Sequence, residues 1–153
     1  MGTRRVSNGK PRTPDTAHMN DSDNKNTYAH TALAALDVEM LASIGGKSGL
    51  ASPLVSRLLT LFRQEAVKLV HGIENALAND DQEALQRSAH TLKSSCASVG
   101  AVALSTLARE IEYLARQCNL AEAAVAVAAL PAEVRRLMAA LDALEGSGGL
   151  SPT

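Results

Sequence analysis

Residues 85–99 read LQRSAHTLKSSCASV and contain one apolar stripe and one histidine that stands apart from it. The members of the stripe recur every three or four residues, which places them on one face of an α-helix. These members are Leu85, Ala89, Leu92, Cys96 and Val99. At about 100° per residue, His90 falls well off that face. The pattern therefore predicts a bundle helix with an imidazole on its solvent side.

The outer face of this segment carries side chains suited to phosphoryl chemistry. Neutral imidazole, the main form of histidine near pH 7, has a lone pair that can attack phosphorus. A lysine one turn away can neutralise charge on phosphoryl oxygens, and small side chains leave the ring open to another protein. The residues that flank His90 on this face are Gln86, Arg87, Lys93, Ser94 and Ala97. A histidine on a charged helix face is usually just solvated, so this spacing alone keeps phosphotransfer as one option among several.

Helical periodicity continues on both sides of this segment. Apolar residues make up 46% of the 153-residue chain and aromatic residues only 2%, so the core must consist of aliphatic layers, as in helical bundles. The predicted helices span residues 31–43, 53–78, 81–98, 101–118 and 120–144. In the longest of them, the apolar stripe consists of Leu54, Leu58, Leu61, Phe62, Leu69, Ile73 and Leu77.

Residues with strong helix-end preferences separate these helices. Three pairs are typical of helix starts: Ser52 with Pro53, Asp80 with Glu83, and Asn119 with Glu122. The glycine pair at 45–46 and Gly100 are expected to end helices. Pro131 is expected either to kink the last helix or to split it in two.

The sequence argues against several function classes. The net charge of −1, and the lack of aromatic residues among the N-terminal basic residues, disfavour nucleic-acid binding. Residues 45–48 read GGKS, but Leu41 stands where a P-loop needs its first glycine, so we expect no nucleotide site. Cys96 and Cys118 lack metal-type spacing, and we expect both to be small buried hydrophobes in helices. The histidines have no second ligand at the right spacing, so no metal site is predicted.

The two ends of the chain differ from the helical region in composition. Residues 1–28 are rich in Gly, Pro, Asn, Asp, Ser and Thr and are expected to be a disordered linker or arm. Residues 29–145 are the predicted helical domain, and residues 146–153 a flexible tail. No secretory signal is visible, and the most apolar run, residues 120–130, is too short to span a bilayer. We therefore expect a cytoplasmic chain that does not insert into a membrane.

Residues 90–101 read HTLKSSCASVGA and resemble the signature of histidine-phosphotransfer (HPt) domains. That signature has His, any residue, Leu, Lys, Gly, a small residue pair, two variable positions, and an aliphatic residue before Gly and Ala. The resemblance extends over roughly residues 33–144, including the glycine break at 45–46. One departure is Ser94, where the family usually has Gly. Because Ser is still small, this departure puts partner preference in doubt more than function.

The resemblance implies an antiparallel four-helix bundle with an additional N-terminal helix. It implies that His90 is phosphorylated and that Lys93 contacts the phosphoryl group or the partner. Glu112 falls where relatives often have a Glu or Gln that accepts from imidazole Nδ1–H and leaves Nε2 free. The alternative for Glu112 is an ordinary surface carboxylate near Arg109 and Arg116. The phosphate- or partner-contacting face would include Gln86, Arg87, Ser94 and Ala97.

The implied function is reversible phosphoryl transfer between His90 and an aspartate of a response-regulator receiver domain, which would supply Mg²⁺. The chain itself would need no cofactor and would not be an enzyme on its own. We expect a monomer, either freestanding or the C-terminal, cytoplasmic module of a membrane-bound hybrid sensor histidine kinase. Two other classes remain open: a non-catalytic module that sequesters a partner through the same face, and a dimerising kinase helix pair, which would need an ATP domain.

Overall fold

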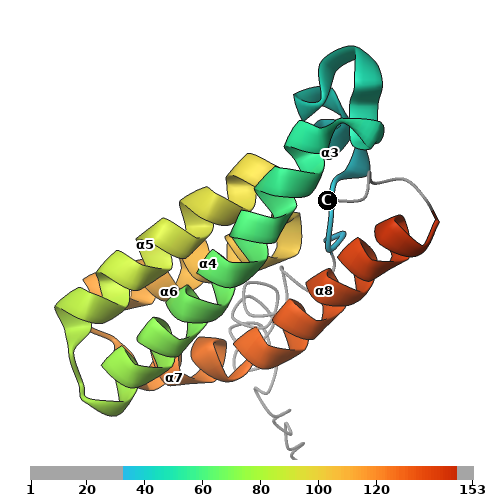
Figure 1. The fold of residues 1–153 in the computed structure, drawn as a ribbon. Coiled ribbons are helices and arrows are strands. Elements are labelled where there is room, and N and C mark those ends of the chain that lie inside the picture. Colours follow the sequence, from blue (N-terminus) through green and yellow to red (C-terminus); the bar gives the residue numbers. More distant parts are fainter. Residues whose placement is uncertain (1–32, 148–153) are drawn as a thin grey trace, which may run out of the picture.

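The computed structural model describes residues 33–147, and all regular secondary structure in this part of the chain is helical (Figure 1). The all-α class is therefore confirmed, as is a short N-terminal helix before the long ones. The predicted arm at residues 1–28, and all of the tail beyond residue 147, lie outside the described residues. The elements are α3 Val38–Ile44, the 3₁₀ helix η1 Gly46–Ala51, α4 Pro53–Ala78, α5 Gln82–Val99, α6 Val102–Arg116, α7 Leu120–Ala128 and α8 Leu130–Gly146.

The helices pack as an antiparallel bundle around an aliphatic core. Helix α5 packs most extensively against α6 and α4 (Figure 1). Helix α7 packs against α6 and α4, and α8, which follows α7, contacts α6. The predicted stripe of α5 is confirmed, because all five of its residues are buried. Within residues 33–147, no helix combines the length and the apolar character needed to cross a bilayer. The largest fully buried side chains of the bundle include Leu59, Ile73, Leu85, Leu92, Leu104, Leu107, Ile111, Leu130, Leu137 and Leu141.

The first helix begins later than the predicted range of residues 31–43, so the predicted start is wrong. Helix α3 begins at Val38, and the Asp37 side chain caps it by accepting from the Met40 N–H at 3.0 Å. Before the cap, the chain pairs with the turn between α5 and α6: Asp37 N–H donates to the Gly100 carbonyl oxygen at 2.7 Å. Gly100 has φ +81°, and a Cβ there would lie 2.9 Å from the Asp37 carbonyl oxygen. Tertiary pairing thus outweighs the helix propensity of residues 33–36.

The buried face of α4 also differs from the predicted stripe. Leu54 and Leu61 are 59% and 58% exposed. Apolar residues surround much of this helix, so spacing alone allows more than one stripe, and contact with its neighbours in the bundle selects among them. Near Gly72 the approach to α5 is close, since a Cβ there would meet Ser88 Oγ at 3.4 Å. The residues that α4 buries are Val55, Ser56, Leu59, Phe62, Ala66, Val70, Ile73 and Ala76.

Two of the predicted helix starts are confirmed, and one is shifted. Ser52 accepts from Leu54 N–H at 3.2 Å, and Asn119 accepts from Glu122 N–H at 3.2 Å. The cap of α5 is Asp81, not Asp80, because Asp81 accepts from Ala84 N–H at 3.1 Å while Asp80 takes φ +52° in the turn. Pro131 splits the last predicted helix: it lies in the first turn of α8, where a missing N–H leaves no bond unmade.

The two cysteines have different environments, which corrects one expectation. Cys96 is fully buried in α5, and burial raises the pKa of its thiol to about 12. Cys118 is exposed and has φ +56° in the turn that follows α6. Helix α6 ends at Arg116, two residues earlier than predicted, because the chain must turn there to enter α7. Cys118 is therefore a turn residue and not a small core hydrophobe.

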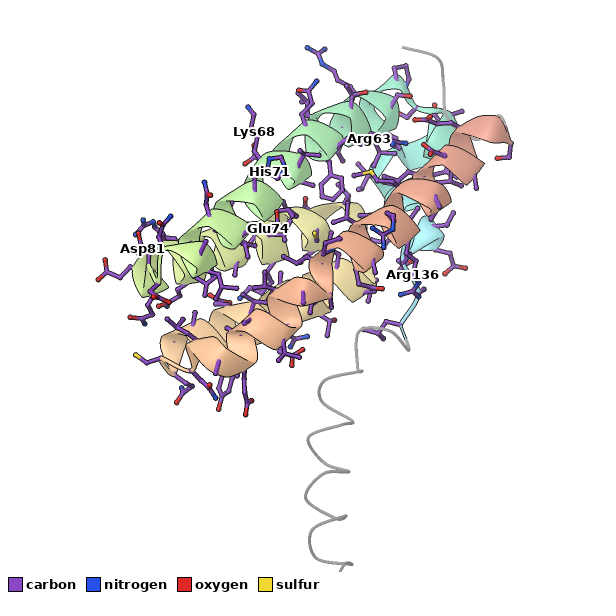
Figure 2. All side chains as sticks on the ribbon, turned by 90° about the horizontal axis from the view of Figure 1, so that it is seen from below. Arg63, Lys68, His71, Glu74, Asp81 and Arg136 are labelled. Carbon is purple, nitrogen blue, oxygen red and sulfur yellow. The ribbon has the colours of Figure 1, made fainter. Side chains whose placement is uncertain are left out.

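Two arginines form bonds that connect α8 to α4 and to the segment before α3 (Figure 2). Arg63 on α4 donates from Nη2 to Asp142 Oδ1 on α8 at 3.1 Å. Arg136 on α8 pairs with the buried Glu133 at 2.9 Å and also donates to the carbonyl oxygen of Leu33. The second arginine therefore holds the segment before α3 against the bundle.

Candidate functional site

Helix α5 presents His90 to solvent from the middle of its length. Burial of the apolar stripe fixes the rotation of α5 about its own axis, so a residue off that stripe must point outward. The His90 side chain is 59% exposed. The sequence-based placement of the imidazole on the solvent side of a bundle helix is therefore confirmed.

Helix α6 brings Glu112 against this imidazole. Two hydrogen bonds fix the antiparallel register of α5 and α6: Gln82 Nε2 donates to the Ala115 carbonyl oxygen at 2.9 Å, and Ser105 Oγ donates to the Lys93 carbonyl oxygen at 3.1 Å. Between them, Glu112 Oε2 lies 2.6 Å from His90 Nδ1. Glu112 is only 4% exposed, so the alternative of an ordinary surface carboxylate is wrong.

Two cations share the same carboxylate. Lys93 Nζ donates to Glu112 Oε1 at 2.6 Å, and Arg116 Nη2 donates to Glu112 Oε2 at 3.2 Å. We call His90, Lys93, Glu112 and Arg116 the Glu112 cluster. With the imidazole neutral, its formal charges are −1 for the carboxylate and +1 for each cation. The cluster therefore satisfies a buried carboxylate and keeps a net positive charge.

The pKa of Glu112 lies below the usual value for a glutamate side chain. Burial acts in the opposite direction and is the largest single influence. The hydrogen bonds from Lys93 and His90, together with the positive charge of Lys93 and that of the imidazole when it is protonated, outweigh it. Glu112 is consequently ionised at neutral pH and can only accept hydrogen bonds.

This ionisation determines which nitrogen of His90 carries the proton. A carboxylate that accepts at 2.6 Å requires a donor, so the neutral imidazole is protonated on Nδ1. The lone pair of the ring is then on Nε2. Within residues 33–147, Nε2 has no hydrogen-bond partner. In its neutral form the ring therefore presents an exposed, oriented nitrogen lone pair that can act as a nucleophile.

An open hollow of about 480 Å³ lies beside the imidazole. Of the flanking residues predicted from sequence, Gln86 and Arg87 line it. Lys93 does not line it and instead lies against Glu112, while Ser94 and Ala97 are exposed further along α5. The hollow is lined by Glu83, Gln86, Arg87, His90, Thr91, Glu112 and Arg116.

Sequence reasoning did not identify Arg116 as a site residue. In the sequence it stands only as a neighbour of the expected surface carboxylate Glu112. A usable signal was present, because Arg116 follows Glu112 by four residues on one helix, a spacing that places the two side chains next to each other. This spacing points to Arg116 as a site residue only once Glu112 is known to contact His90.

We expect Glu112→Gln to lower the free energy of unfolding by more at pH 7 than at pH 3. The pKa of Glu112 in the folded state lies below its unfolded value of about 4.3. The ionised side chain therefore adds stability that is fully present above that value and is lost as pH falls through the folded pKa. Urea unfolding at both pH values measures the difference. Glu65→Gln, at an exposed position on α4, is the control for loss of one acidic group, and equal losses for Glu112→Gln at both pH values would contradict the expectation.

Comparison with known proteins identifies a family over most of the bundle. The family model described as Hpt domain matches residues 57–144, which include α5, α6 and the whole Glu112 cluster. Sensor protein TorS of Escherichia coli (strain K12) is 44% identical over 54 residues, which is 35% of this chain. The matched region is 6% of the length of TorS, so the chain corresponds to a small part of that relative.

Proposed function

Because this chain belongs to the Hpt domain family, we propose that it is a phosphocarrier that takes a phosphoryl group on His90 Nε2 and exchanges it with an aspartate of a receiver domain. One observation carries the proposal. The imidazole is exposed, its Nδ1 is bound to a buried carboxylate, and its Nε2 is open to a partner. Such a group can act as a nucleophile without a nucleotide site in the same chain.

The proposed transfer step conserves atoms and charge. The lone pair on His90 Nε2 attacks the phosphorus of an aspartyl phosphate in line with the leaving oxygen. The P–N bond forms, the P–O bond breaks, and the partner's aspartate leaves as a carboxylate. Nδ1–H stays bonded to Glu112, whose negative charge offsets the positive charge that develops on the ring. The reverse step returns the phosphoryl group to the aspartate.

The remaining predicted residues would serve the partner and the phosphoryl group. We propose that Lys93, which uses one of its three N–H donors on Glu112, offers another to the phosphoryl oxygens. Gln86 and Arg87 would contact the partner or the phosphoryl group from the hollow. Ser94 and Ala97 are small and exposed, so they would leave room for a receiver surface over the ring. Mg²⁺ would be held by the receiver.

The similarity to a sensor protein supports a role for this domain as one step of a signalling pathway. We propose that the domain works as a monomeric, cytoplasmic relay module, whose phosphoryl donor or acceptor is the receiver domain of a hybrid sensor histidine kinase or of a response regulator. As an isolated domain it would not be an enzyme that uses ATP.

A transfer assay tests the function against simple partner binding. The full chain is mixed with a set of isolated receiver domains that carry labelled aspartyl phosphate. Rapid movement of label to the chain, in an acid-labile and alkali-stable form, is the expected result. Tight association with no movement of label would overturn the relay function in favour of a module that sequesters its partner.

A further inference from the structure

We propose that Ser105 is a positioning residue for phosphoryl transfer, which holds the backbone of Lys93 at the spacing that lets Glu112 bind His90. The inference rests on the proposed function and extends it to a residue outside both the signature motif and the Glu112 cluster. Ser105 lies in the first turn of α6 and is half-buried where this helix meets α5.

The first argument is the direction of the Ser105 hydroxyl. Serine and threonine side chains inside helices commonly donate to a carbonyl oxygen three or four residues earlier in the same helix. Ser98 of α5 does so, with a bond of 2.7 Å to the Ser95 carbonyl oxygen. Ser105 Oγ instead donates across to α5, to the Lys93 carbonyl oxygen at 3.1 Å. A carbonyl oxygen has two lone pairs, so Lys93 accepts this bond in addition to the one within α5.

The second argument is that α6 holds Lys93 at both ends of the residue. Ser105 binds its carbonyl oxygen, and Glu112 Oε1 binds its ammonium group at 2.6 Å. Ser105 and Glu112 are close to two helical turns apart, so both side chains lie on the face of α6 that meets α5. The two bonds together fix how far the backbone of α5 stands from α6 beside the imidazole.

The third argument is that the Glu112 carboxylate has little freedom to follow α5 if the two helices separate. Its side chain is 5% exposed, and its two oxygens bind Lys93 Nζ and His90 Nδ1 at 2.6 Å each. Wider spacing would lengthen the bond to Nδ1, which keeps the proton on that nitrogen and the lone pair on Nε2. A neutral ring with its proton on Nε2 has no lone pair there to attack phosphorus. Ser105 therefore acts on the reacting nitrogen through Lys93 and Glu112, without touching it.

The tautomer of His90 is the first measurement. Nitrogen NMR of the ¹⁵N-labelled full chain distinguishes a neutral imidazole protonated on Nδ1 from one protonated on Nε2. We expect Ser105→Ala to lower the ratio of the first form to the second about two- to tenfold, the factor for loss of one net hydrogen bond. Ser105→Thr keeps a hydroxyl and should restore most of the wild-type ratio. Ser98→Ala is the matched control, because it removes a hydroxyl that bonds within α5, and we expect it to leave the ratio unchanged.

The rate of loading by a small phosphodonor is the second measurement. Phosphoramidate loads the full chain as His90 Nε2 attacks phosphorus, the bond from phosphorus to the amine breaks, and ammonia leaves. We expect Ser105→Ala to slow loading at least about twofold, and Ser105→Thr to recover most of the rate. Ser98→Ala should load as the wild type does. Helical circular dichroism of all three variants should match that of the wild type, because no substitution removes an apolar core side chain.

The outcomes separate the role of Ser105 from the proposed function. An unchanged tautomer ratio or an unchanged loading rate for Ser105→Ala would overturn the positioning role and leave the phosphocarrier function standing. An equal effect of Ser98→Ala would also overturn it, because the change would then follow from the loss of any hydroxyl on these helices. Failure of the wild type to take label from both phosphoramidate and phosphorylated receivers would overturn the proposed function, while the tautomer ratio would still decide whether Ser105 positions the imidazole.

Discussion

Replacing His90 with glutamine is expected to abolish acid-labile phosphate on the chain while its helical circular dichroism stays that of the wild type. The amide of glutamine approximates the size and polarity of imidazole but has no nucleophilic nitrogen lone pair. The side chain at position 90 is 59% exposed and contributes nothing to the apolar core. The substitution should therefore remove phosphorylation without disturbing the fold.

The measurement is incubation with labelled phosphorylated receiver domains, followed by denaturing electrophoresis at neutral and at acid pH. His71→Gln is the matched control, since His71 is also an exposed histidine on a long helix but lies on α4 and not in the Glu112 cluster. The control should accept label as the wild type does. Label that persists in His90→Gln and is lost in His71→Gln would move the site to α4, and label lost in neither would rule out both histidines.

Leu59→Ala is expected to lower the free energy of unfolding by about 2–5 kcal/mol. Leu59 is 1% exposed in the second turn of α4, so the substitution removes buried methyl groups and leaves a cavity that rigid neighbouring helices cannot fill. Domains of this size are stable by about 5–15 kcal/mol, so the loss is a large part of the total. Urea unfolding followed by circular dichroism measures the change.

Leu61→Ala is the control for this prediction. It makes the same chemical change two residues away on the same helix, at a side chain that is 58% exposed. We expect a loss of less than about 0.5 kcal/mol. Similar losses for the two variants would mean that the buried face of α4 is not the one described, and a larger loss at Leu61 would favour the stripe predicted from spacing.

The stripe of α5 and that of α4 show when spacing alone predicts burial. In α5 the outer positions are polar or small, so one apolar face is possible and the prediction was confirmed at all five residues. In α4, leucines occur on more than one face, and Leu54 and Leu61 remain exposed while smaller residues such as Ala66 are buried. Side-chain size does not decide which face meets the neighbouring helix. Contact between helices decides it, and a local pattern does not contain that information.

Some helix ends are likewise predicted by a local signal, and others are decided by tertiary contacts. Ser52 and Asn119 act as predicted because a cap satisfies N–H groups two or three residues away, so the signal is local. Residues 33–36 have helix-favouring side chains, but this segment pairs with the start of α6 and the turn before it: Ala34 accepts from Ala103 N–H, and the next residues lead to the bond from Asp37 N–H to the Gly100 carbonyl oxygen. Cys118 likewise continues a helical pattern in sequence, yet the chain must turn there for α7 to pack on the bundle.

For the site, the sequence by itself determined that His90 stands on the solvent side of a helix, because the helical period and the buried stripe are both properties of one short segment. Only the tertiary structure decided what the imidazole touches. Glu112 becomes a buried acceptor because α6 lies antiparallel to α5 in one register, and that register also brings Lys93 to the same carboxylate. Arg116 reaches this carboxylate from the same helix, four residues after Glu112. Contacts between residues 19 to 22 positions apart depend on how two helices pack, whereas the direction of a single side chain depends on its own helix alone.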